Sequence, residues 1–369
     1  MKKNLPLIAL FALILALPAL DSVFHFSPVK DLFEKRLPIE KPRLPKNFNE
    51  AQEYPKNFEK FFNDNYGFRK SLVSANSHLM DKIFDESPDA RALIGLDGWL
   101  YFDNHNSLLD AVGRAKISDE LVARGVKAFG ENWKKMRGKN INYLLVIAAD
   151  KSTIYPEFLP SYMKPSKPHR IDKFLSALKK EYPDFPVLDL RPILKKAKEK
   201  EIVYHKTDTH WNRRGGHYAY VEIAKILKFK PHLREDFIDK SDGEIMGDIS
   251  DIMNSAATNV DYSLTPKFKI NSYHKANLSK EFEAFHKPAF FVNNDRALPT
   301  IFVYKDSYFG ELFELMSEHF SESLFVNEFP CNLNEEIIKK FPSKHGPNVV
   351  IQEFWEGRIE VVLNQCQTR

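Results

Sequence analysis

The chain has 369 residues, enough for one large domain or two moderate ones, and 43% of them are hydrophobic, including 30 phenylalanines and 14 tyrosines. The formal net charge is only +4, with acids and bases mixed along the chain, so no dense basic stripe favours nucleic acid as a partner. Two cysteines, Cys331 and Cys366, lack CxxC or metal-ligand spacing and either pair in an oxidising compartment or stay as free thiols.

The N-terminus has the pattern of a secretion signal or signal anchor, which we assign to residues 1–26. Lys2 and Lys3 precede an apolar run over residues 5–20. At about 1.5 Å per residue this run covers roughly 24 Å, short of a ~30 Å bilayer core, and residues up to 24 extend it. Leu17-Pro18-Ala19 is a poor cleavage site, which favours an inner-membrane anchor over residues 5–24 rather than a cleaved signal peptide. Both alternatives place the remainder in the periplasm, whereas a buried N-terminal helix would leave it in the cytoplasm.

Residues 27–57 contain five prolines and many charges, which predicts a semi-rigid linker before a domain spanning residues 58–369. Helical spacing lies on either side of Gly67 in the run 58–69. Residues 93–102 then predict a hairpin, because Asp97-Gly98 is a tight-turn dipeptide between apolar arms.

From there the pattern alternates between apolar strands and amphipathic helices. Strands are expected at 143–149, 186–190, 300–304, 323–326 and 348–352, and helices at 122–136, 171–182, 220–227 and 309–320. This alternation predicts an α/β fold with a mostly parallel sheet covered on both faces. Residues 255–298 are polar and break the pattern, so we interpret them as a small insertion with an antiparallel part, before the strand that leads to Ser307.

Ser307 directly follows a predicted buried strand and precedes a predicted helix. Reactive groups collect at the carboxyl ends of strands in open α/β sheets. The N-terminus of the helix would also favour an oxyanion forming beside the hydroxyl. A plain helix N-cap is the competing interpretation, since Asp306 and Ser307 are both favoured there. We expect Asp306 to be structural, through hydrogen bonds to loop amides.

Asp208 and His210 lie two residues apart in Thr207-Asp208-Thr209-His210-Trp211-Asn212, so their side chains point to one side of an extended segment. With Ser307 they supply the carboxylate, imidazole and hydroxyl of a nucleophilic triad. The alternatives are two surface loop residues, which the packing expected of Trp211 disfavours, or a metal site built from His205, Asp208, His210 and His217. No HExxH-like spacing supports a metal, and we predict none.

Four further residues are candidates for contact with substrate. Lys151 and Tyr155 follow the predicted strand at 143–149 and could bind an acidic or hydroxyl-rich ligand, although a solvated loop accounts for them equally well. Trp211 and Tyr308 adjoin His210 and Ser307 in the sequence.

Five runs together resemble a known family. Asn63-Asp64-Asn65-Tyr66-Gly67-Phe68-Arg69, Gly98-Trp99-Leu100-Tyr101, residues 150–156, Thr207–Asn212 and Lys305-Asp306-Ser307-Tyr308-Phe309 match in order. Over about residues 55–360 the chain is similar to the SGNH-hydrolase-like domain of the alginate O-acetyltransferase AlgJ/AlgX family. The resemblance implies an SGNH, flavodoxin-like α/β/α fold with Ser307 as nucleophile, His210 as general base and Asp208 as its orienting carboxylate. Lys305 departs from the family pattern, since many SGNH proteins have glycine there.

The function implied by this resemblance is extracytoplasmic transfer of acetyl groups onto sugar hydroxyls of an exopolysaccharide, alginate-like in the named family. It also implies a membrane-bound O-acyltransferase as the partner that delivers acetyl, and no cofactor on this chain. Two alternatives remain at this point: a carbohydrate acetyl esterase that uses the same three residues, and a non-catalytic glycan-binding scaffold of the cell envelope.

Overall fold

The computed structural model describes residues 5–24, 26, 39–79, 89, 91–253, 255, 257–274, 278, 282, 285, 288–342 and 346–366. The chain forms two compact units. The first comprises Met1–Ile94 with Asp248–Ala257, and the second comprises Gly95–Gly247 with Thr258–Arg369. The sequence interpretation had placed both parts of the second unit in one domain together with residues 58–94.

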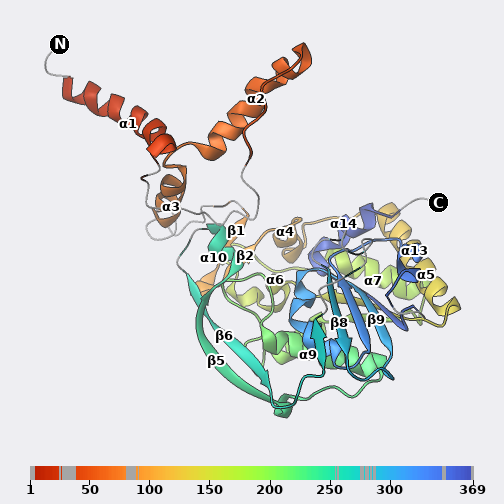
Figure 1. Ribbon diagram of the computed structural model, residues 1–369. Coiled ribbons are helices and arrows are strands. Elements are labelled where there is room, and N and C mark those ends of the chain that lie inside the picture. The colour runs from red at the N-terminus through yellow and green to blue at the C-terminus, as the bar shows by residue number, and fades with distance from the viewer. Residues whose placement is uncertain are drawn as a thin grey trace. The chain divides into compact units, whose positions relative to one another are not determined.

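The first unit is mainly helical (Figure 1). Its elements are α1 (Leu5–Phe24), α2 (Phe48–Asn65), α3 (Arg69–Leu79), β1 (Ala92–Ile94) and α10 (Asp248–Met253). The Asp21 carboxylate accepts a 2.7 Å hydrogen bond from the Phe68 N–H, and the Ser22 hydroxyl accepts one of 2.9 Å from the Gly67 N–H. These bonds attach the end of α1 to the turn between α2 and α3, where helical spacing was predicted on both sides of Gly67.

Helix α2 begins at Phe48, inside the segment 27–57 that the prolines had predicted to be a linker. The Asn47 side chain caps this helix by accepting a hydrogen bond from the Glu50 N–H, and Pro55 lies within the helix. The capping signal therefore outweighs the proline content here. Residues 27–38 of the predicted linker lie outside the described residues.

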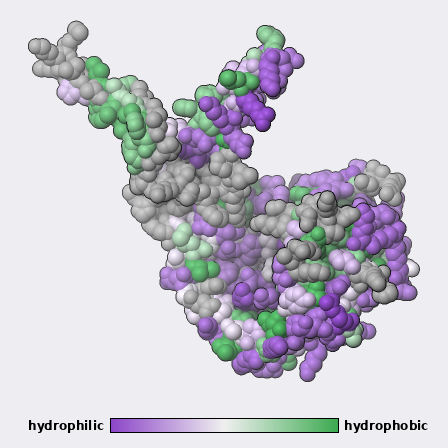
Figure 2. Space-filling view, viewed as in Figure 1, coloured by the Kyte–Doolittle hydropathy of each residue, from purple (hydrophilic) through white to green (hydrophobic). Residues whose placement is uncertain are grey.

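Helix α1 coincides with the predicted anchor and exposes apolar side chains, among them Leu7, Phe11 and Ile14. Figure 2 shows hydrophobic surface, in green, along this helix. Within the described part of the chain, no helix meets the length and hydropathy expected of a membrane span.

The second unit is built on a seven-stranded mixed sheet in the order β4-β3-β11-β9-β10-β8-β7 (Figure 1). Its strands are β3 (Asn142–Ala148), β4 (Val187–Asp189), β7 (Ser272–His274), β8 (Ala289–Asn293), β9 (Thr300–Tyr304), β10 (Glu322–Val326) and β11 (Val349–Trp355). The strands from β4 to β10 pair in parallel, and β8 and β7 add to one edge antiparallel. The predicted α/β class is confirmed, with two antiparallel strands at one edge.

The other elements of this unit surround the sheet. They are β2 (Leu100–Phe102), α4 (Ser107–Ala111), α5 (Asp119–Gly138), α6 (Lys151–Ile154), α7 (Arg170–Glu181), α8 (Arg191–Ala197), α9 (Arg213–Leu227), β5 (Phe237–Met246), β6 (Thr258–Pro266), the 3₁₀ helix η6 (Ser307–Leu312), α12 (Phe313–Ser317), α13 (Glu335–Lys339) and α14 (Ile359–Asn364). Asp97 and Gly98 both have positive φ, as a tight turn at the predicted position requires.

Alternate residues along the strands separate the two faces of the sheet. On one face Tyr143, Leu145 and Ile147 of β3 join a core with apolar residues of α5, α7 and α14. On the other face Phe325 of β10 packs against Phe313 of α12, with ring centroids 4.4 Å apart. Helices thus cover both faces, which is why the central strands are mostly apolar.

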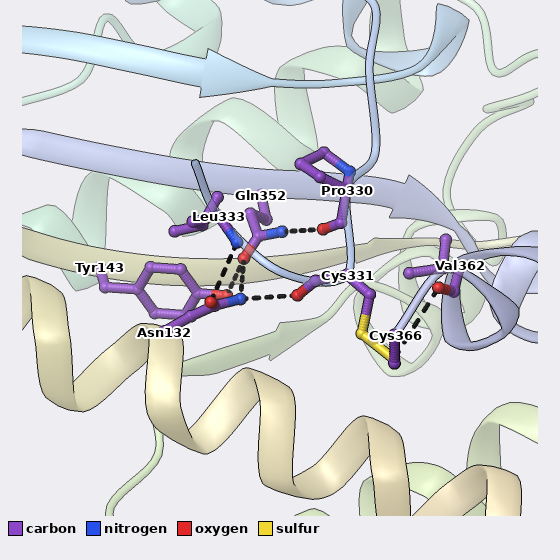
Figure 3. The surroundings of a disulfide bond; sticks show 8 residues. All are labelled: Asn132, Tyr143, Pro330, Cys331, Leu333, Gln352, Val362 and Cys366. Atoms are coloured by element: carbon purple, nitrogen blue, oxygen red, sulfur yellow. Dashed lines mark hydrogen bonds between the residues drawn. A yellow bond between two sulfur atoms is a disulfide. The ribbon is translucent and has the colours of Figure 1, made fainter. Parts of the chain in front are cut away.

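A disulfide between Cys331 and Cys366 joins the segment after β10 to the end of α14 (Figure 3). Beside it lies a buried polar cluster. Asn132 of α5 donates to the Cys331 carbonyl and to Gln352 of β11, and accepts from the Leu333 N–H. Gln352 Nε2 donates to the Pro330 carbonyl, so both polar atoms of this side chain are satisfied within the strand, as burial requires.

The predicted insertion at 255–298 contains β6, β7 and β8 among its described residues. Strand β6 pairs antiparallel with β5, which begins at Phe237, so the hairpin starts well before the predicted boundary. The two strands form the long ribbon drawn in teal in Figure 1. Strand β5 was missed because it carries five charged or glycine residues between Asp239 and Glu244 that hide its alternation.

Candidate active site

Ser307 lies at the carboxyl end of β9, as predicted, and is exposed. The helix that follows it is the short 3₁₀ helix η6 rather than a long α-helix. Asp306 caps η6, because its Oδ1 accepts from the Tyr308 N–H at 3.0 Å, and its Oδ2 accepts from the Trp355 N–H at 2.8 Å. The expected structural role of Asp306 is therefore confirmed, and it extends across to β11.

Glu353 of β11 contacts this turn and is 1% exposed. Its Oε2 accepts a 2.9 Å hydrogen bond from the Asp306 N–H. Burial, followed by repulsion from Asp306, raises the pKa of Glu353 well above its usual value. The raised pKa favours the neutral form of Glu353 beside the Asp306 carboxylate.

The loop carrying Asp208 and His210 is closed at its base by a bridge between Tyr204 and Trp211. Inside the loop, Asp208 Oδ1 accepts from the backbone N–H of His210 at 2.9 Å, which makes a tight Asx-type turn. The two side chains were expected to share a side of an extended segment. They meet through this turn instead, because the carboxylate bonds to the backbone of the residue it orients.

Lys151 also holds the loop that carries Asp208 and His210. It is 3% exposed, and its ammonium donates to the backbone carbonyls of His205, Lys206 and Asp208 at 3.3, 3.0 and 2.7 Å. Lys151 is placed there by Asp150, which follows β3 and caps α6 by accepting from the Ser152 N–H. Burial and the nearby Glu356 raise the pKa of Asp150 to about 6.

The three predicted side chains meet at the edge of the sheet. His210 Nδ1 is 2.7 Å from Asp208 Oδ1, and His210 Nε2 is 2.7 Å from Ser307 Oγ. Because a carboxylate can only accept, Nδ1 carries the proton and Nε2 accepts from the serine hydroxyl. The Asp208 and His210 side chains are 21% and 25% exposed, so a ligand can reach them. This arrangement can activate a hydroxyl nucleophile.

An aromatic group packs beside the imidazole. The Tyr308 ring is 4.8 Å from His210 and lies edge-on to Trp211 at 5.2 Å. The Tyr308 hydroxyl donates to the Thr209 carbonyl at 3.0 Å, which joins the serine turn to the histidine loop. These contacts fix the ring of His210 relative to Ser307.

The four predicted substrate contacts lie within the fold. Lys151, Tyr155, Trp211 and Tyr308 are all less than 5% exposed. Besides the contacts above, the Tyr155 hydroxyl accepts from the Val203 N–H. Their burial supports a role in positioning the loop and turn of the site. Contact with substrate stays a prediction.

Two histidines of the metal alternative have other partners. His217 Nε2–H donates to the His232 carbonyl at 3.0 Å, and His210 uses both ring nitrogens on Asp208 and Ser307. To coordinate a metal ion, His210 and His217 would have to give up these hydrogen bonds.

Sequence reasoning missed Glu353 and Trp355 as parts of the site. The strand was expected to end at Gln352, whereas β11 runs to Trp355. A glutamate and a glutamine within the apolar run Val349–Trp355 are the signal that was available, because a charged residue in a central strand needs a specific partner.

The resemblance in sequence is confirmed by a family match. Residues 92–248 match the family described as SGNH hydrolase-like domain, acetyltransferase AlgX. The matched range contains Asp208 and His210 and ends before Ser307. No curated protein is detectably similar to the chain in sequence.

Several solved structures share the fold. Bacillus cereus PatB1 aligns with a TM-score of 0.55 and 15% identity, over 74% of this chain and 99% of that one. A DHHW family protein from Eubacterium siraeum aligns with a TM-score of 0.52 and 14% identity, over 75% and 99%. The O-acetyltransferase domain of Pseudomonas putida AlgJ gives a TM-score of 0.44 and 18% identity, over 73% and 92%. The first two likenesses show the fold alone.

Proposed function

We propose that this protein is an extracytoplasmic O-acetyltransferase that moves acetyl groups onto sugar hydroxyls of an exopolysaccharide through Ser307, His210 and Asp208. The observation that carries the proposal is the pair of 2.7 Å contacts that link Asp208 to His210 and His210 to Ser307. The acetyltransferase family match over residues 92–248 supports acetyl as the transferred group. The alginate-like polymer named by the family stays a prediction.

Transfer proceeds in two balanced steps. Ser307 Oγ attacks the carbonyl carbon of an acetyl donor while His210 Nε2 takes the hydroxyl proton. The donor's leaving group departs with that proton, which leaves acetyl on Ser307. A sugar hydroxyl then attacks the acetyl carbon, gives its proton to Nε2, and Ser307 recovers that proton as the acetylated sugar leaves. Asp208 stabilises the positive imidazolium in both steps.

Each step passes through an oxyanion that needs hydrogen-bond donors. The Tyr308 N–H already donates to Asp306, so we assign the N–H of Ser307 itself as one donor. Lys305 stands where many SGNH proteins have glycine. Its N–H donates to the Val326 carbonyl, and its ammonium lies 5.0 Å from the Phe313 ring. Lys305 therefore serves the packing around β9 in this proposal.

The proposed location is the periplasm, with helix α1 as the anchor to the inner membrane or as a cleaved signal. The Cys331–Cys366 disulfide supports an oxidising compartment. Acetyl-CoA is absent there, so the proposed donor partner is a membrane-bound O-acyltransferase that supplies acetyl from the cytoplasmic side. The exposed apolar side chains of α1 support its proposed contact with lipid.

Acetyl ester hydrolysis is the second candidate activity. Ser307 is exposed, so water can reach an acetyl group bound there. Whether the protein transfers the acetyl group or hydrolyses it depends on whether a sugar hydroxyl outcompetes water for the acetyl-enzyme. Both activities need the same acetyl-enzyme.

The test is Ser307→Ala in the full chain, assayed by hydrolysis of 4-nitrophenyl acetate. We expect kcat/KM to fall by about 10⁴-fold, because the three groups act as a unit. Ser161→Ala, which removes a hydroxyl from an exposed loop, is the matched control and should change kcat/KM less than about twofold. Retention of activity by Ser307→Ala, or acetyl trapped on another residue in mass spectrometry, would overturn the proposal.

A further inference from the structure

A groove of about 230 Å³ opens beside the serine turn. One wall is formed by Gly310 and Glu311 of η6, the helix that begins at Ser307. Arg213, the first residue of α9, borders it three positions after His210. At about 2 Å per residue along a 3₁₀ helix, Gly310 and Glu311 lie roughly 6 and 8 Å along the axis from Ser307. One or two sugar rings bridge that separation.

Aromatic rings line the groove and are held rigid by their neighbours. Phe268 stacks on His232 at 3.7 Å and is half-buried. On the other side Phe291 and Phe313 lie 6.2 Å apart, and both are partly exposed. Rigid rings with one accessible side offer apolar area at little entropic cost to a ligand that has an apolar face. The C–H face of a pyranose is such a surface.

The charge of the groove is mainly negative. Three carboxylates line it, from Glu311, Glu314 and Glu318, against one guanidinium, from Arg213. Arg213 lies 3.4 Å from Glu311, and Glu318 accepts hydrogen bonds from the backbone amides of Asn271 and Ser272. Carboxylates accept hydrogen bonds from hydroxyl groups and repel other carboxylates. The groove therefore suits a ligand rich in hydroxyls and without negative charge.

We propose that this groove is the acceptor subsite, and that it binds one ring of an uncharged saccharide beside Ser307. Its volume lies below the roughly 300–1,000 Å³ of sites for drug-sized ligands, which fits a single ring. The inference rests on the proposed function and refines it. A polyuronate such as alginate carries a carboxylate on each ring, and the three glutamates that line the groove would repel it.

The first test fills the groove. A Cβ at Gly310 would meet no atom within 4 Å, so Gly310→Phe adds a ring to the open space with little strain on the fold. The full-chain protein is acetylated with 4-nitrophenyl acetate and offered cellotetraose or tetragalacturonate. In the wild type we expect acetyl transfer to cellotetraose to exceed transfer to tetragalacturonate at least tenfold. In Gly310→Phe the ratio of transfer to hydrolysis should fall about tenfold or more.

The second test changes only the charge. Glu314→Lys reverses one carboxylate of the groove, and we expect it to lower the preference for cellotetraose over tetragalacturonate at least fivefold. Glu199→Lys makes the same change at an exposed position after α8 and should leave the preference unchanged within twofold. Equal acetylation of both tetrasaccharides by the wild type, or an unaltered transfer ratio in Gly310→Phe, would refute the subsite.

A binding measurement separates this inference from the proposed catalysis. Calorimetry with the Ser307→Ala variant requires no chemistry and should detect cellotetraose but not tetragalacturonate at equal concentration. Adding Gly310→Phe to that variant should abolish the heat of binding. If Ser307→Ala retains full esterase activity while this binding pattern holds, the catalytic assignment fails and the subsite stands. Absence of cellotetraose binding would overturn the subsite whatever the catalytic result.

Discussion

The turn that carries Ser307 and the loop that carries His210 are held by buried charges of opposite sign. The serine turn is held by acids, since Asp306 accepts from the N–H groups of Tyr308 and Trp355, and Glu353 accepts from that of Asp306. The histidine loop is held by a cation, since the Lys151 ammonium donates to three backbone carbonyls.

The difference follows from which backbone groups each segment leaves unpaired. A helix start exposes N–H groups, so η6 needs an acceptor at its N-terminus. A tightly bent loop directs several carbonyls toward one point, where a lysine with three donors can satisfy them. Side chains therefore complete the hydrogen bonding of each segment, two carboxyl groups at the serine turn and one ammonium at the histidine loop. Asp306 follows β9 and Lys151 follows β3, and both strands pair in parallel with β11, which places the halves of the site at the same end of the sheet.

The largest effect should come from removing the acidic anchor. Asp306→Ala deletes an N-cap and a second acceptor, and we expect the unfolding free energy to fall by about 4 kcal/mol. Ester hydrolysis should fall about 100-fold, because a shift of about 1 Å at a reacting group has that effect. Urea unfolding and 4-nitrophenyl acetate kinetics measure both.

The control for Asp306 is Asp295→Ala. Asp295 also accepts from a backbone N–H, that of Ala297, but lies on an exposed turn. Its loss should lower the unfolding free energy by less than about 1 kcal/mol and leave activity intact. Similar losses for both variants would mean that burial of Asp306 adds nothing to its effect on unfolding free energy or activity.

Removing the cationic anchor should have the next largest effect. Lys151→Met keeps the length of the side chain but removes the ammonium that donates to three part-buried carbonyls, of which that of Lys206 still accepts from the Leu100 N–H. We expect a loss of about 3 kcal/mol in unfolding free energy and roughly tenfold in kcat, with KM little changed, since the loop that orients His210 loosens.

Lys206→Met is the matched control for Lys151, because Lys206 belongs to the same loop and its ammonium donates to an exposed carbonyl, that of Asp97, at 3.2 Å. Its effect should stay below about 1 kcal/mol. A change in substrate affinity rather than kcat in Lys151→Met would instead favour the original prediction that Lys151 contacts substrate.

The smallest effect at pH 7 should come from Glu353→Gln. Glutamine resembles the neutral acid in shape and keeps an oxygen that can accept from the Asp306 N–H, so activity should stay within about threefold. The two proteins should differ in how their unfolding free energy depends on pH. The pKa of Glu353 is raised in the folded state, so above the unfolded pKa the folded chain holds the extra proton. Wild-type stability therefore falls as pH rises, until Glu353 ionises in the folded protein.

The glutamine variant lacks this titration, so its stability relative to wild type should rise from pH 5 to pH 8, by at most about 1.4 kcal/mol per pH unit. Urea unfolding at four pH values gives the slope. A difference that is flat with pH would mean that Glu353 is ionised in the folded protein, and the acidic anchor would then be two charges rather than one.

Much of this arrangement could be predicted from local patterns. The run Thr300–Tyr304 gave a buried strand with Ser307 at its end, and the short spacing of Asp208 and His210 predicted that these two would act as a pair. The helix that starts at Phe48 was missed, because its prolines suggested a linker. Strand β5 was missed because charged residues interrupt its alternation.

The sequence by itself determined the local structure around the three proposed catalytic residues, because a strand, a cap and a short Asx turn depend on neighbours within a few positions. Only the tertiary structure decided what holds them. Trp355 reaches Asp306 and Lys151 reaches the histidine loop across 49 and 57 positions of chain. Backbone amides and carbonyls carry no residue-specific signal, so their partners become visible only when parallel strands bring distant strand ends to one edge of the sheet.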